Sequence, residues 1–160
     1  MGTAASSGAL LVAEIGIRQM QESDLDAVLV VENRAFTTPW SRAAFEEEIT
    51  SNDLAHYLVV VEDGKLVGYG GFWLVLDEAH VTNIALLPEH QGAGYGSLLL
   101  EHMILTAKML GAVSMTLEVR PSNVPARKLY SRRGFVERGL RPNYYAELGE
   151  DALIMWLDKL

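Results

Sequence analysis

The sequence predicts one α/β domain of the mixed α+β type, in which a central, mostly antiparallel sheet lies between helices on both of its faces. Three observations support this prediction. The chain of 160 residues is 49% hydrophobic, which is enough for one domain with a substantial core. Short alternating or apolar runs, bounded by Gly, Pro, Asp or Asn, recur along the chain and predict strands. A long helical stretch stands between two of these runs, which implies a right-handed crossover and a parallel strand pair.

The first half of the chain predicts one strand, two helices and then three antiparallel strands. Residues 15–20 alternate between polar and apolar and predict the first strand. Ser23 is expected to cap a helix over residues 24–36, and Ser41 a short helix that ends near Thr50. The three strands are joined by a hairpin turn at Asp63-Gly64 and a turn at Asp77-Glu78, and they are expected at residues 55–62, 65–76 and 79–87.

The second half predicts two more helices and three more strands. A long helix at residues 97–110 ends at Gly111, which suits the position after a helix C-terminus. A strand at 114–119 and a helix at 124–133 follow, and Gly134 ends that helix. A final antiparallel pair is expected at 135–139 and 152–157, joined by a long loop over 140–151.

Charge and composition exclude several classes of function. The formal net charge of −8 repels phosphate backbones, so nucleic-acid binding is not expected, whereas a cationic amine or a basic peptide would be attracted. Cysteine is absent, which excludes disulfides and thiol nucleophiles. No metal site is predicted because the four histidines lack metal-ligand spacing. They are interpreted as structural or surface residues, at positions His56, His80, His90 and His102.

The N-terminal residues 1–14 are predicted to be a flexible segment ahead of a single domain at 15–160. Their apolar run, 9–13, is too short for a membrane span and lacks a basic n-region. Gly2 and Ser6 fit the myristoylation pattern formally, but no second membrane signal accompanies them. The expected protein is therefore cytoplasmic, without membrane attachment, and a monomer or weak dimer.

A loop with three glycines, Gly92, Gly94 and Gly96, stands between the apolar strand that Pro88 ends and the long helix. This layout presents bare backbone N–H groups and the positive end of a helix, which together suit an anion. Glycine matters because a Cβ would hold the ligand away from those amides. The alternative is a glycine-rich turn that binds nothing.

The spacing of this loop discriminates between known anion-binding motifs. The dinucleotide fingerprint fails because Ser97 or Leu99 stands where its last glycine should be, and the P-loop fails because the loop has no lysine. The pattern that fits is Gln-x-x-Gly-x-Gly, at Gln91, Gly94 and Gly96. Here the chain resembles the GNAT superfamily of acetyl-CoA-dependent N-acetyltransferases.

The resemblance extends to the order of the elements from residue 15 onward, and it implies a GNAT fold with a splayed parallel pair at the CoA site. Within the superfamily the chain resembles the bacterial ribosomal-protein-alanine N-acetyltransferases, the RimI type. One departure is Gly92, where the family often has an arginine, so a cation beside the phosphates is missing. Four stretches carry the closer resemblance: residues 36–41, 76–79, 117–123 and 141–145.

The resemblance implies two catalytic side chains. Glu118 would be the base that collects a proton from the amine, directly or through a water, and Tyr130 the acid that protonates the leaving thiolate. The alternatives are a polar strand residue facing solvent for Glu118 and a core aromatic for Tyr130. The backbone amide of Leu86 is the expected oxyanion donor.

The resemblance also implies binding residues for acetyl-CoA and for the acceptor. Ile84 and Leu86 would offer backbone groups to the pantetheine, and Asn123 its side chain, although Asn123 could equally cap the following helix. The remaining acetyl-CoA positions are Ala85, Gln91, Gly92, Ala93, Gly94, Tyr95, Gly96, Ser97 and Tyr130. The acceptor peptide would lie against Trp40, Glu118, Arg141, Tyr144 and Tyr145, for which the alternative is surface aromatics on loops.

Three functions follow as hypotheses. The first is an N-α-acetyltransferase of the RimI type that uses acetyl-CoA and modifies the N-terminal alanine of a small-subunit ribosomal protein by direct transfer in a ternary complex. The second is a GNAT enzyme for a small amine, or for other protein N-termini or lysines. The third is a non-catalytic acyl-CoA-binding module, against which the presence of both Glu118 and Tyr130 argues.

Overall fold

The computed structural model describes residues 13–160, so most of the predicted flexible segment 1–14 lies outside the described residues. One sheet of seven strands runs through this part of the chain, in the order β1-β2-β3-β4-β5-β7-β6. The strands are β1 (Ile15–Gln19), β2 (Ala55–Glu62), β3 (Lys65–Val75), β4 (Glu78–Leu86), β5 (Ser114–Val119), β6 (Val136–Tyr145) and β7 (Glu150–Leu157).

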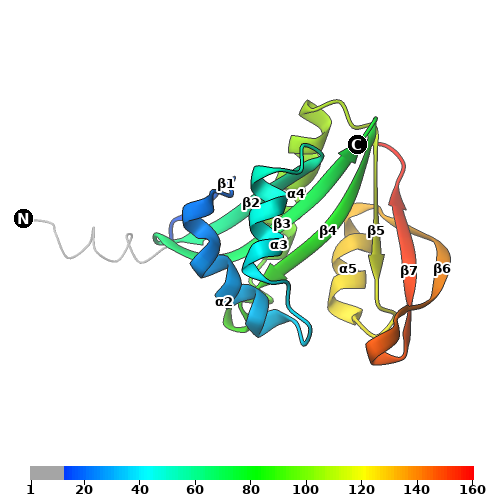
Figure 1. The fold of residues 1–160 in the computed structure, drawn as a ribbon. Coiled ribbons are helices and arrows are strands. Elements are labelled where there is room, and N and C mark those ends of the chain that lie inside the picture. Colours follow the sequence, from blue (N-terminus) through cyan, green and yellow to red (C-terminus); the bar gives the residue numbers. More distant parts are fainter. Residues whose placement is uncertain (1–12) are drawn as a thin grey trace, which may run out of the picture.

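Every strand pair is antiparallel except β4 and β5, which are parallel and joined by helix α4 (Tyr95–Met109). The predicted mixed, mostly antiparallel sheet is thus confirmed. The parallel pairing covers only residues 78–80 of β4 and 114–116 of β5. Beyond those positions the two strands separate, and Figure 1 shows the sheet opening between them. The splayed parallel pair is therefore present.

A β-bulge lies in β4 where this separation begins. Gly71 of β3 pairs with Asn83, and the next residue, Phe72, pairs with Val81, so Thr82 is an extra residue on β4. A bulge bends its strand and increases the local twist. The bend carries the second half of β4 away from β5.

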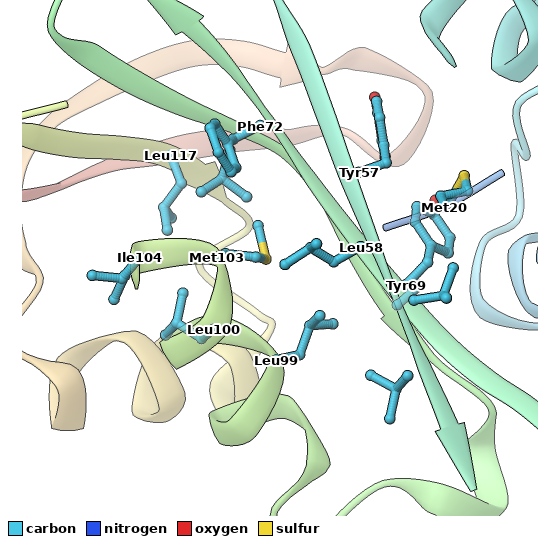
Figure 2. Close-up of a cluster of buried hydrophobic side chains, with 14 of the residues drawn as sticks. Met20, Tyr57, Leu58, Tyr69, Phe72, Leu99, Leu100, Met103, Ile104 and Leu117 are labelled. Atoms are coloured by element: carbon cyan, nitrogen blue, oxygen red, sulfur yellow. The ribbon is translucent and has the colours of Figure 1, made fainter. Parts of the chain in front are cut away.

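Helices cover both faces of the sheet. They are α2 (Leu25–Ala35) and α3 (Arg42–Thr50) on one face, with α4 and α5 (Val124–Arg133) on the other. Neighbouring residues of β3 show the two faces: the Tyr69 ring packs edge-on against Phe45 of α3, whereas a Cβ on Gly70 would meet Met103 and Leu99 of α4. Figure 2 shows the α4 side chains and Tyr69 on opposite sides of the strand.

The start of α2 differs from the prediction, because Ser23 does not cap it. A 3-10 turn, η1 (Glu22–Asp24), precedes α2, and Asp24 accepts the backbone N–H of Gln21 at 2.8 Å. Asp24 also binds Arg18 of β1 through two hydrogen bonds, at 2.7 and 2.8 Å. A carboxylate that can reach both partners outcompetes the Ser23 hydroxyl as the organising group. By contrast, Ser41 caps α3 as predicted, since its hydroxyl accepts the Ala44 N–H at 3.2 Å.

The predicted long loop over residues 140–151 is wrong. Strand β6 continues to Tyr145, and only the 3-10 turn η3 (Ala146–Leu148) separates it from β7. Arg141 pairs with Ala152 and Tyr145 with Glu150, with an irregular register between them. Because β6 is an exposed edge strand it shows no polar–apolar alternation, and an edge tolerates Pro142.

Gly71 is required because the Tyr57 ring lies over it. A Cβ at Gly71 would overlap that ring, so we expect Gly71→Ala to lower the free energy of unfolding by about 1–3 kcal/mol, as overpacking does. Urea unfolding measures this. Gly16→Ala is the matched control, because a Cβ on that strand glycine has no atom within 4 Å, and equal losses in the two variants would contradict the expectation.

Candidate active site

Glu118 lies on β5 beside the opening between β4 and β5, and its side chain is only 10% exposed. Its Oε2 is 2.7 Å from Nε2 of His80, which stands on β4 at the last paired position of the parallel ladder. Its Oε1 is 3.6 Å from Nη1 of Arg141 on β6. The carboxylate thus sits between two basic side chains, one from β4 and one from β6, and does not face bulk solvent.

These contacts shift the pKa values of both partners. Burial is the largest influence on Glu118 and raises its pKa, but the hydrogen bond from His80 and the charges of His80 and Arg141 together outweigh it, so the net pKa is lowered. The hydrogen bond to Glu118 raises the pKa of His80, against the opposing effect of burial. Glu118 is therefore ionised at neutral pH, and His80 holds a proton more tightly than an ordinary histidine.

His80 is a functional candidate that the sequence interpretation missed, since it was taken as a structural or surface residue. It lies 38 positions from Glu118, and nothing in the local pattern relates the two. The signal available in the sequence was its place at the start of the strand that leads into the glycine loop. Only the parallel register of β4 and β5 brings it to the carboxylate.

The segment 141–145 gathers around Glu118, as the sequence predicted for the acceptor side. The Tyr145 hydroxyl donates to the backbone oxygen of Glu118 at 3.4 Å. Tyr144 and Tyr145 pack edge to face with ring centroids 5.0 Å apart, and the Arg141 guanidinium lies over the Tyr144 ring at 5.2 Å. These aromatics belong to the end of β6 and are not scattered on a loop.

Tyr130 on α5 is buried, with 7% exposed, and its ring packs against Phe135 with centroids 5.7 Å apart. Burial, and then the neighbouring Tyr145, raise its pKa well above the ordinary value, so the phenol keeps its proton at neutral pH. Within residues 13–160 its hydroxyl has no hydrogen-bond partner, which leaves the proton available to a ligand atom. Tyr130 is thus a core aromatic, and its role as the acid stays a prediction.

The glycine loop has the backbone form that an anion site requires. Gly92 and Gly94 have φ values of 79° and 88°, and Gly94 is the residue that precedes α4. A Cβ on either would have no atom within 4 Å, so open space lies beside both. Ala93, Gly96 and Ser97 complete the loop and the first turn of α4. Bare amides at a helix N-terminus beside open space fit a phosphate group.

Along β4, the backbone N–H and C=O groups of the predicted pantetheine-binding residues point alternately towards β3 and away from it. Leu87 donates its N–H to Val67 of β3 at 2.8 Å, which marks a hydrogen-bonded position of the antiparallel ladder. Because such positions alternate, the N–H and C=O groups of Leu86 and Ile84 point away from β3, towards the opening. Ala85 instead faces β3 with its backbone. The Leu86 carbonyl accepts Nε2 of Gln91 at 3.3 Å, so Gln91 joins the loop to the strand.

Two groups of hydrogen-bonded side chains anchor the glycine loop. Glu62 at the end of β2 accepts the Tyr95 hydroxyl and lies 3.3 Å from Nε2 of His90, whose ring stacks on Tyr95. Glu89, in the 3-10 turn η2 (Pro88–His90), binds Arg34 of α2 at 2.8 and 2.9 Å. The Tyr95 side chain is therefore committed to Glu62, and only its backbone amide is left for a ligand.

Asn123 caps α5, because its side chain accepts the Ala126 N–H at 3.3 Å; a contact to a ligand stays a prediction. Trp40 packs against Phe45 with ring centroids 5.3 Å apart, and no described contact joins it to Glu118.

A depression between α4 and α5 brings two cations near the glycine loop, and sequence reasoning missed them. It is lined by Ser97, Leu100, Glu101, Leu129, Arg132 and Arg133.

Comparison with known proteins identifies the family of this fold and site. Residues 25–135 match the family model described as the acetyltransferase (GNAT) family. The chain belongs to the GNAT family of acetyltransferases. It is 45% identical over 141 residues to a Bacillus subtilis (strain 168) protein provisionally named a ribosomal protein bS18-alanine N-acetyltransferase, with 88% of this chain and 93% of the relative covered.

Two further comparisons agree with this GNAT assignment. The Escherichia coli (strain K12) ribosomal protein bS18-alanine N-acetyltransferase is 39% identical over 145 residues, covering 88% of this chain and 95% of that protein. The crystal structure of the Escherichia coli ribosomal-protein-S18-alanine N-acetyltransferase superposes with a TM-score of 0.83 at 35% identity, covering 92% of this chain and 96% of that one. The predicted GNAT fold is therefore confirmed.

Two negative findings concern only residues 13–160 of this GNAT acetyltransferase. No group of three or more His, Asp or Glu side chains there could hold a metal ion. No helix in the same part of the chain is long and apolar enough to cross a membrane.

The His80–Glu118 pair predicts a pH dependence of stability. The lowered pKa of Glu118 means that its contribution is present above the ordinary value of 4.5 and is lost as pH falls through the folded value. The raised pKa of His80 means that its contribution is present below 6.5 and is lost as pH rises through the folded value. We expect His80→Gln to abolish the loss of folding stability that accompanies the deprotonation of His80, and to raise the pKa of Glu118.

Urea unfolding between pH 4 and 9 and a carboxyl NMR titration of Glu118 measure these effects. His102→Gln is the control, since the one hydrogen bond of the His102 ring within residues 13–160 is to the Leu98 carbonyl of its own helix, at 3.0 Å. Identical pH profiles for the two variants would contradict the pairing.

Proposed function

We propose that this protein is an acetyl-CoA-dependent N-α-acetyltransferase that modifies the N-terminal alanine of a small-subunit ribosomal protein. The observation that carries the proposal is Glu118: an ionised, nearly buried carboxylate, paired with His80, at the opening between β4 and β5 and on the side of the glycine loop. The names of the bacterial relatives, which cover almost the whole chain at 45% and 39% identity, support the same acceptor.

The residues that would hold acetyl-CoA follow from the backbone groups that the fold leaves open. The amides of residues 92–97 would bind the pyrophosphate at the N-terminus of α4, with Arg132 supplying a charge that Gly92 does not. The outward-facing groups of Ile84 and Leu86 would pair with the pantetheine, and the Leu86 N–H would stabilise the oxyanion. Acetyl-CoA supplies the thioester, and no metal is needed for this chemistry.

Proton transfer sets the requirements on Glu118 and His80. The acceptor amine must lose a proton before it attacks the thioester carbonyl; the C–N bond then forms and the C–S bond breaks. An α-amine with a pKa of about 8 needs only about 1.4 kcal/mol for this at neutral pH. The lowered pKa of Glu118 makes it a weak base by itself, and the hydrogen bond that helps to lower it raises the pKa of its partner His80. The pair therefore accepts the proton as a unit.

Tyr130 and the acceptor wall complete the proposed roles. The raised pKa of Tyr130 keeps its proton in place until the thiolate leaves, and transfer of that proton converts the CoA thiolate to a thiol. Arg141, Tyr144 and Tyr145 lie on the other side of Glu118, where they would contact the incoming peptide. The net charge of −8 favours a basic N-terminal segment as the acceptor.

The first experiment follows acetylation of a peptide that begins with Ala-Arg by mass spectrometry. We expect one acetyl group on the α-amine, and kcat about 10²-fold lower or more in both Glu118→Gln and Tyr130→Phe, because each loses one proton-transfer group. Glu47→Gln, on an outer position of α3, is the control and should keep full turnover.

The outcomes separate the three hypotheses. Turnover on polyamines or amino acids but not on the peptide would support a small-amine enzyme. CoA binding without any turnover would support the binding module. Full activity in both Glu118→Gln and Tyr130→Phe would show that the assigned roles are wrong.

The second experiment tests the glycine loop. We expect Gly94→Ala to raise the Kd for CoA at least tenfold, because alanine strains the backbone at φ 88° and places a methyl group where the ligand would lie. Isothermal titration calorimetry measures this. Gly111→Ala is the matched control at the other end of α4, with φ 101° and equally open surroundings. Equal affinities in the two variants would place CoA elsewhere.

A further inference from the structure

Two glutamates that cover the sheet are buried without a cation. Glu32 on α2 is 1% exposed and Glu48 on α3 is 9% exposed, and within residues 13–160 neither has a basic partner. A buried carboxylate is costly unless hydrogen bonds compensate it. Each of these two instead accepts the hydroxyl of a tyrosine from the centre of the sheet: Tyr69 for Glu32 and Tyr57 for Glu48.

The Glu32 network connects four elements: β4, β3, α2 and the loop between α2 and α3. Asn83, at the bulge of β4, donates its side-chain N–H to the Tyr69 oxygen at 2.9 Å, and Tyr69 donates its hydroxyl to Glu32. The other oxygen of Glu32 accepts the backbone N–H of Trp40 at 2.9 Å. The hydrogen bonds converge on Glu32: Asn83 and Tyr69 donate towards it from β4 and β3, and Trp40 donates to it from the loop between α2 and α3.

Burial and the charge of Glu32 raise the pKa of Tyr69 well above the ordinary value, so the middle donor keeps its proton at neutral pH. The Tyr69 ring is completely buried, and it contacts Phe45, which also packs against Trp40. The connection between β4 and Trp40 is therefore both hydrogen-bonded and closely packed.

The Glu48 network resembles the first at the bulge but ends elsewhere. The Tyr57 hydroxyl lies 3.1 Å from Oγ1 of Thr82 and donates to Glu48 at 2.7 Å. Glu48 also accepts the Trp73 indole N–H at 2.7 Å and the Asn52 amide at 2.6 Å. This network stays between α3 and the sheet, and within residues 13–160 none of its hydrogen bonds reaches the loop that carries Trp40, although the Tyr57 and Tyr69 rings lie with centroids 6.5 Å apart. It is a natural internal control for the first.

We propose that Glu32 and Tyr69 are positioning residues, which fix the loop carrying Trp40 relative to the bulged part of β4. The inference rests on the proposed function, because β4 lines the proposed acyl-CoA opening and Trp40 is a proposed wall for the acceptor. Acyl transfer requires the amine and the thioester carbonyl in near-attack geometry, and a misplacement of about 1 Å can reduce the rate about 10²-fold. Glu32 and Tyr69 thereby hold the loop with Trp40, which would contact the acceptor, in a fixed position relative to β4, which would contact acetyl-CoA.

The test compares Tyr69→Phe with Tyr57→Phe. Each variant removes the hydroxyl of a buried tyrosine of the sheet, and with it the hydrogen bond to a buried glutamate. Both variants should therefore lose a similar amount of thermal stability. We expect only Tyr69→Phe to raise KM for the Ala-Arg peptide at least fivefold. The Kd for CoA should change less than twofold in this variant. NMR hydrogen exchange of the Trp40 amide should accelerate at least tenfold in Tyr69→Phe and stay at the wild-type rate in Tyr57→Phe.

Two results would overturn the proposal. One is a Tyr69→Phe variant that is less stable but has wild-type Trp40 amide exchange and peptide KM. The other is an equal rise of KM in both variants, which would make the effect a general loss of stability. If Tyr69→Phe does not fold, Asn83→Ala interrupts the same network at its partly exposed end, and the same measurements and limits apply.

The test also distinguishes this inference from the proposed function. Trp40 amide exchange is measured without any substrate, so it reports on the hydrogen-bond network alone. A wild-type chain that does not acetylate the peptide would contradict the acceptor assignment. Accelerated Trp40 exchange in Tyr69→Phe would still show that Glu32 and Tyr69 hold the loop.

Discussion

The separation of β4 from β5 after three paired residues is the constraint on which the rest of the structure depends. Buried backbone N–H and C=O groups are almost always hydrogen-bonded, so a sheet that opens in its middle must offer them another partner. Here the outward groups of Ile84 and Leu86 face the opening, and the Gln91 side chain satisfies one of them, the Leu86 carbonyl. The remaining groups are the ones that a thioester cosubstrate can pair with. The opening is thus a consequence of strand register and also the proposed binding site.

Four glutamates stabilise the elements around this opening, and each of them is hydrogen-bonded to a tyrosine or a histidine. Glu118 is paired with His80 across the strands, Glu62 accepts Tyr95 at the glycine loop, and Glu32 and Glu48 accept Tyr69 and Tyr57 beneath the bulge. A tyrosine hydroxyl satisfies one carboxylate oxygen without adding a positive charge beside it. The arrangement is consistent with a protein that attracts a cationic amine, and it uses the chain's acidic excess within the fold as well as on its surface.

The elements that could be predicted from the sequence are those specified by neighbouring residues. The Asp63-Gly64 turn adopts positive φ at both positions and joins β2 to β3, and Ser41 caps α3 through an atom three residues away. The elements that were missed depend on distant partners. Ser23 does not cap α2 because it lies within the 3-10 turn η1, in which Asp24 is bound by Arg18 and the Gln21 N–H. The end of β6 is ordered by β7 without any alternation of its own. The His80–Glu118 contact exists only through the parallel register, which no local pattern encodes.

The electrostatics of Glu118 bear on which amine this site can use. At neutral pH, a lysine side chain with a pKa of about 10.4 needs roughly 4–5 kcal/mol for deprotonation, against about 1.4 kcal/mol for an α-amine. A strong base would be a desolvated carboxylate with a raised pKa, but His80 and Arg141 reverse the effect of burial on Glu118. The site therefore gains a stable, oriented anion and gives up basicity. That exchange suits an amine that is already close to neutral, so the same contacts that keep Glu118 ionised favour a chain terminus over a lysine side chain as the acceptor.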